Sequence, residues 1–96
     1  MLKLREFLNA VEDNENVILV ANDDECYSSL GNHKKENWLL ALDWFEERFE
    51  AQFTVIQLSR RYGCVCLRLG EIRSGLTKQL EILGNDAATT NAFINL

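Results

Sequence analysis

The clearest pattern of apolar and polar positions lies in the stretch WLLALDWFEERFE, residues 38–50. At about 100° per residue, its apolar and acidic side chains separate onto two faces of one helix. The apolar face, which we expect to pack against a core, comprises Trp38, Ala41, Leu42, Phe45 and Phe49. The acidic face, which is either a solvated surface or a binding surface, comprises Asp43, Glu46, Glu47 and Glu50.

Leu40 and Trp44 stand one turn apart beside this acidic face, outside the expected core side. A large aromatic side chain next to carboxylates is typical of a protein-binding surface, because tryptophan supplies contact area and the charge attracts a cationic partner. The alternative is that the last segment of the chain covers both residues. Arg48 lies off the acidic face, so the helix itself relieves little of the repulsion between its carboxylates.

The segment before this helix predicts a short helix and two strands. Four apolar residues have the i, i+3, i+4, i+7 spacing of an amphipathic helix: Leu4, Phe7, Leu8 and Val11. The apolar run at residues 17–21 predicts a central strand of the kind that is covered on both faces. Residues 22–25 predict a turn, and residues 26–30 predict a returning strand. Gly31 and Asn32 would end that strand, and Asn32 would cap the next helix.

Residues 53–73 support two interpretations. Apolar positions that alternate on either side of residues 60–63 predict a β-hairpin, and the β-branched residues favour it. The same segment also resembles a helix-turn-helix, with Gly63 in the turn and Gly70 as a departure from the pattern inside the second helix. In that alternative, four arginines would contact the groove or the backbone phosphates of a nucleic acid: Arg60, Arg61, Arg68 and Arg73.

A last helix is predicted to begin at Ser74, with leucines repeating on one face and a stop at Gly84–Asn85. The elements then follow the order α-β-β-α-β-β-α. This order predicts an α+β fold in which helices pack on one face of a mainly antiparallel sheet. A chain of 96 residues without proline is expected to form a single compact domain over residues 1–96.

Charge is distributed unevenly along the chain, whose formal net charge is −5. Acidic residues predominate before residue 53, and basic residues slightly predominate after it. The acidic half indicates a protein partner with a basic surface. Nucleic acid would be a partner only in the helix-turn-helix alternative.

Residue patterns that support catalysis or metal binding are few. Cys64 and Cys66 have C-x-C spacing, which differs from the C-x₂-C of most zinc knuckles, and Cys26 and His33 are distant in sequence. No spacing ties a nucleophile to a base, and no glycine loop is built for phosphate. We therefore expect no enzyme activity, no metal and no cofactor. Charges near the N-terminus and the absence of a long apolar run argue against a secretory signal and a membrane segment, so we expect a cytoplasmic protein.

These observations predict a small acidic, non-catalytic protein that binds and modulates or inhibits a partner protein. A nucleic-acid-processing enzyme or complex is one class of partner, because carboxylates can occupy sites built for phosphates. The expected binding residues are Leu40, Asp43, Trp44, Glu46, Glu47 and Glu50. Two alternatives stay open: a DNA-binding regulator that uses residues 53–73, and a homodimeric structural subunit that buries Leu40 and Trp44.

Overall fold

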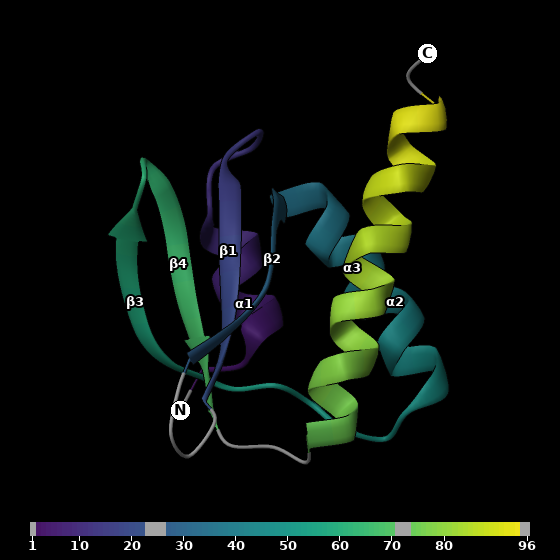
Figure 1. Ribbon diagram of the computed structural model, residues 1–96, viewed down its shortest axis with the longest axis horizontal. Coiled ribbons are helices and arrows are strands. Elements are labelled where there is room, and N and C mark those ends of the chain that lie inside the picture. Colours follow the sequence, from purple (N-terminus) through teal and green to yellow (C-terminus); the bar gives the residue numbers. More distant parts are fainter. Residues whose placement is uncertain (1, 23–26, 71–73, 95–96) are drawn as a thin grey trace.

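The computed structural model describes residues 2–22, 27–70 and 74–94 (Figure 1). The described residues form three helices and four strands in the order predicted from the sequence. In chain order the elements are α1 (Leu4–Ala10), β1 (Asn16–Asn22), β2 (Tyr27–Lys34), α2 (Lys35–Arg48), β3 (Val55–Arg61), β4 (Cys64–Leu69) and α3 (Ser74–Ile94). The Cα radius of gyration is 12.5 Å, the value of about 12–13 Å expected for one compact domain of this length.

The four described strands form one mixed sheet in the order β2-β1-β4-β3. Antiparallel pairs β1–β2 and β3–β4 lie on either side of a parallel β1–β4 pairing. The predicted central strand is confirmed, because β1 has a neighbour on each side. Two of the three pairings are antiparallel, as the sequence predicted.

The core lies on one face of this sheet. Alternate residues such as Val17 and Leu19 in β1, and Val65 and Leu67 in β4, belong to one buried cluster with residues of all three described helices. The opposite face of β1 is covered unevenly, because Val20 is buried there with 7% of its surface exposed. Ile18 points to the opposite face, is partly exposed and does not belong to that cluster.

The described part of the segment, residues 53–70, forms the β-hairpin of β3 and β4, so the helix-turn-helix alternative is wrong. The paired residues Leu58 and Leu67 lie in register across β3 and β4. Tyr62 and Gly63 form the turn with positive φ angles of 53° and 76°, which suit a two-residue hairpin because they match the twist of the strands. Arg73 lies outside the described residues.

The predicted break at residues 31–32 is also wrong, because β2 continues to Lys34. Gly31 pairs with Leu19 beside a bulge, and its φ of 138° lies in a region that glycine tolerates. Asn32 pairs with Ile18 and caps no helix. Instead, α2 begins after Lys34 without a side-chain cap. Of the turn predicted at residues 22–25, only Asn22 is described, at the end of β1, and Cys26 also lies outside the described residues.

The predicted stop at Gly84–Asn85 is wrong as well, since α3 runs on to Ile94 and its last turns extend beyond the sheet (Figure 1). Gly84 allows α3 to pack closely against α2. A Cβ atom at this position would lie 2.5 Å from Cζ3 of Trp38, so the glycine lets α3 approach the α2 tryptophan. None of the described helices combines the length and apolarity needed to cross a membrane.

Candidate functional site

Buried aromatic residues fix the rotation of α2, and this rotation sets which of its side chains face outward. Trp38 and Phe45 are fully buried, as predicted. The indole Nε1 of Trp38 donates a hydrogen bond of 2.8 Å to the carbonyl oxygen of Val17 in β1. The Phe45 ring lies 4.9 Å from that of Phe49 and 4.8 Å from that of Phe53. Phe49 is only partly buried, because α2 ends at the residue before it.

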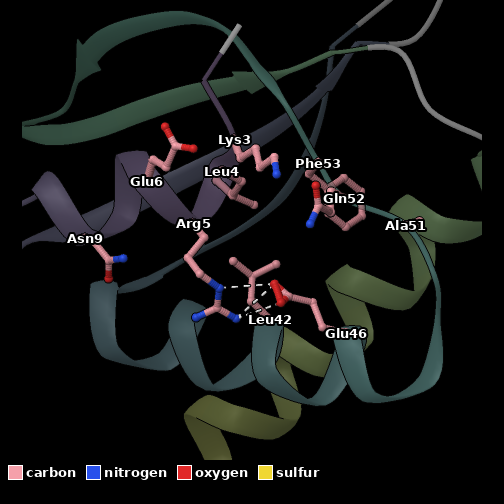
Figure 2. Close-up of a pocket in the computed structure, with 10 residues that line it drawn as sticks. All are labelled: Lys3, Leu4, Arg5, Glu6, Asn9, Leu42, Glu46, Ala51, Gln52 and Phe53. Atoms are coloured by element: carbon pink, nitrogen blue, oxygen red, sulfur yellow. Dashed lines mark hydrogen bonds and ion pairs between the residues drawn. The ribbon is translucent and has the colours of Figure 1, made fainter.

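Two of the acidic residues of α2 pair with an arginine from α1. Arg5 Nη2 lies 2.9 Å from Asp43 Oδ1. Arg5 Nη2 also lies 3.0 Å from Glu46 Oε1, and Arg5 Nε donates to the same carboxylate, as Figure 2 shows. Burial alone would lower the pKa of Arg5, but hydrogen bonds to Glu46 and Asp43 outweigh it and raise the pKa. The acidic face is therefore partly neutralised by another helix. Sequence reasoning missed Arg5, because nothing in the spacing along α1 shows which helix it faces.

Glu47 and Glu50 carry the unneutralised part of the predicted acidic face, but the prediction that Glu50 belongs to the helix is wrong, because α2 ends at Arg48 and Phe49 is extended. Both glutamates are exposed, and no ion pair joins either of them to a residue in the described part of the chain. Asp43 also remains accessible, with 56% of its side chain exposed beside Arg5. The outer face of α2 thus keeps a negative charge, held by a helix whose position the core determines.

Leu40 and Trp44 are partly buried and pack against the core. On α2 they follow Asn37 by three and seven residues, so the three side chains share one flank of the helix. Asn91 of α3 donates a hydrogen bond to Asn37, which places α3 beside this flank. Leu40 and Trp44 are themselves partly exposed, and the alternative that the last segment covers them stays a prediction.

A small pocket adjoins the Arg5 ion pairs, between α1, α2 and residues 51–53 (Figure 2). Its volume is about 250 Å³, below the roughly 300–1,000 Å³ of most small-molecule sites. Cationic and anionic side chains both line it, including Lys3, Arg5, Glu6 and Glu46. The pocket suits water or one side chain of a partner.

The three described arginines among those singled out for nucleic acid do not share one face of the sheet. Arg60 pairs with Val65 on the helix-covered face and forms a 2.7 Å ion pair with Glu15. Arg61 and Arg68 lie on the opposite face of the sheet, where Arg68 donates a 3.2 Å hydrogen bond to Gln57. The hairpin therefore divides this set between two faces.

The cysteines and the histidine are also separated. Cys64 accepts a 3.6 Å contact from Asn32 on the open sheet face, and Cys66 is buried in the same strand. His33 instead lies against Trp38 and bonds to Asn85 of α3, and burial lowers its pKa although that bond acts to raise it. Within residues 2–22, 27–70 and 74–94, no group of three or more potential ligands could hold a metal ion.

Comparisons with protein-family models, curated proteins and solved structures found no match for this chain. Its function must therefore be inferred from its own geometry and charge. The most defined candidate surface is the outer face of α2, where Arg5 orients Asp43 and Glu46, and where Glu47 has no ion pair with any described residue. Glu50 lies just beyond the end of this helix.

Proposed function

We propose that this chain is a non-catalytic protein that binds, and thereby modulates or inhibits, a partner protein with a basic surface. The contact is made by the outer face of α2. One observation carries the proposal: exposed Glu47 lies one turn from Asp43 on α2, next in the chain to Glu46, and Arg5 holds Asp43 and Glu46 in place. Glu50, beyond the end of the helix, lines a shallow pocket with Glu46 and adds a further exposed carboxylate. Carboxylates that are already oriented lose less side-chain entropy on binding than free ones.

The charges on this face would act chiefly on the rate and specificity of association. Exposed carboxylates attract a cationic surface over distances of about 10 Å at moderate ionic strength. The exposed parts of Leu40 and Trp44 would add apolar contact at the flank of the same helix. A nucleic-acid-processing enzyme fits this description, because its working surface is already built to receive negative charge. A cytoplasmic location is part of the proposal and agrees with the free thiols of Cys64 and Cys66.

Charge reversal on α2 tests the proposal. Glu47→Lys places a cation in the middle of the acidic face, and Asp86→Lys makes the same change on exposed α3. Affinity-tagged wild type and both variants are used to capture proteins from the native host, and the retained proteins are identified by mass spectrometry. We expect a partner that wild type and Asp86→Lys retain and Glu47→Lys loses.

The purified partner then allows a quantitative measurement. We expect Glu47→Lys to weaken binding by about tenfold or more in calorimetry at low salt, and added salt to reduce wild-type affinity. Unchanged amide spectra would show that both variants are folded. Equal affinity of Glu47→Lys and Asp86→Lys for the partner would contradict a role for the α2 face.

A further inference from the structure

An apolar groove runs between α1 and β3, apart from the outer face of α2. Its volume is about 470 Å³. Apolar side chains from three elements and the flanking segments line it: Leu2, Phe7, Ala10, Val11, Leu58 and Val65. None of the proposed binding residues on α2 lines this groove.

The groove is open because the helix layer ends before the last strand of the sheet. Leu58 of β3 and Leu67 of β4 are paired and point to the same face. Leu67 is fully buried, whereas Leu58 is 56% exposed. Leu2, on the other side of the groove, is 54% exposed. The helices therefore cover the sheet as far as β4 and leave Leu58 of β3 exposed on this face.

The outer edge of β3 already receives an extended segment of the chain at one end. Lys3 forms an antiparallel bridge with Thr54. Val55 N donates to Leu2 O at 3.2 Å, and Leu4 N donates to Phe53 O at 2.8 Å. These bonds show that backbone pairing at this edge is compatible with the position of α1.

Beyond Val55 the edge offers further backbone groups. Arg61 and Cys64 flank the two-residue turn, so they form the hydrogen-bonded pair between β3 and β4. Backbone groups alternate in direction along a strand, so those of Leu58 and Arg60 point away from β4. β3 is the last strand in the sheet order, and no described strand pairs with this part of its outer edge.

The charges around the groove indicate what kind of segment fits. Glu6 and Glu12 line its rim, are exposed and have no ion pair with any described residue, whereas Glu15 is paired with Arg60. An occupant with apolar side chains and flanking cations would satisfy both the lining and the rim. A second copy of this chain would instead bring its own Glu6 and Glu12 toward the same carboxylates.

We propose that the groove and the edge of β3 together bind an extended segment of a partner protein, with alternating apolar residues flanked by Lys or Arg. The segment adds a strand to β3 through backbone hydrogen bonds, and its alternate side chains enter the groove beside Leu58. This site stands apart from the α2 face, so either can be correct without the other.

The test uses as its probe a synthetic peptide in which Val alternates with Thr and Lys residues flank this segment at both ends, called the Val–Lys peptide. A second peptide has the same side chains but N-methyl groups on alternate backbone nitrogens, which prevent strand addition. A third replaces Lys with Glu. Binding is followed by the amide resonances of the protein. We expect the first peptide to shift resonances along β3 and α1, and the other two to bind about tenfold more weakly or not at all.

Matched variants locate the site. Leu58→Lys places a charge in the groove and should lower the affinity for the Val–Lys peptide about tenfold. Ile56→Lys makes a similar change on the same strand, because Ile56 is 45% exposed but does not line the groove. This control variant should bind the peptide with wild-type affinity. Glu47→Lys should also bind as wild type does, which separates this site from the α2 face.

Three results would overturn the proposal. Equal binding of the N-methylated peptide would show that no strand is added. Equal binding by Leu58→Lys and Ile56→Lys would place the peptide elsewhere. Resonance shifts confined to α2 and α3 would also show that the peptide binds outside the groove. The amide spectrum of each variant without peptide verifies that it is folded.

Discussion

At the scale of single residues, Arg5 and His33 each interact with side chains of other elements, and these contacts change their pKa values. Arg5 belongs to α1 but pairs with Asp43 and Glu46 of α2. His33 belongs to β2 but lies against Trp38 of α2 and Asn85 of α3. Each therefore reports on how the helices are placed against the rest of the molecule.

His33 should make the free energy of unfolding depend on pH. Its pKa is lowered by burial, although the bond to Asn85 acts in the opposite direction. The unfolded chain, with a histidine pKa of about 6.5, then binds a proton more readily than the folded protein. The stabilising contribution is complete above that pKa and is lost as the pH falls below it.

Denaturant unfolding at about pH 7.5 and about pH 5.5 measures this effect, because His33 is the only histidine and carboxylates titrate mostly lower. We expect the wild type to lose more stability between the two pH values than His33→Gln does. The same loss in both proteins would show that His33 titrates alike in the folded and unfolded states.

At the scale of elements, contacts between helices decide where α3 ends. Glycine normally weakens a helix interior by about 1 kcal/mol relative to alanine. Gly84 nevertheless lies inside α3, where its missing Cβ makes room for Trp38. The packing of α3 on α2 therefore outweighs a local preference that by itself predicts a stop.

Alanine substitutions at two glycines of α3 separate the effect of helix propensity from the effect of packing against Trp38. Gly84→Ala would gain helix propensity but press a methyl group into Trp38, and overpacking costs about 1–3 kcal/mol. We expect a net loss of about 1–2 kcal/mol in the free energy of unfolding from urea titration. A Cβ at Gly75 would meet nothing within 4 Å, so Gly75→Ala should be neutral or stabilising. Similar values for both variants would refute the role assigned to Trp38.

At the scale of the whole molecule, charge and exposed apolar surface are placed on different regions. Carboxylates are concentrated on the outer face of α2 and on the rim of the α1–β3 groove, while Arg61 and Arg68 lie on the open face of the sheet. The exposed apolar side chains are spread over several sites, with Leu58 on β3 and Phe93 at the end of α3. No one of these sites resembles the large apolar interface of an obligate dimer.

We therefore expect a monomer in solution. Leu40 and Trp44, the residues that a homodimer was expected to bury, are partly buried and already pack against the core. Light scattering coupled to size exclusion should give a mass near 11.1 kDa. Twice that mass, lost on Trp44→Lys but kept on Asp86→Lys, would favour the structural homodimer instead.

The sequence by itself predicted the order of the elements and the buried face of α2, and it favoured the β3–β4 hairpin, although the structure was needed to exclude the helix-turn-helix. These features depend on periodicity within one segment, such as Trp38 and Phe45 two turns apart on one face, or on the turn chemistry at Gly63. Side chains close in sequence decide them, so a linear pattern indicates them.

Only the tertiary structure decided the rest. The ion pairs of Arg5 join residues about 40 positions apart, and β2 runs through Gly31 because β1 offers a partner there. Gly84 continues a helix because Trp38 lies beneath it, and Leu58 is exposed because the helix layer ends one strand earlier. Local preferences of about 1 kcal/mol per residue are overridden at these places by contacts between distant elements, which a linear pattern does not contain.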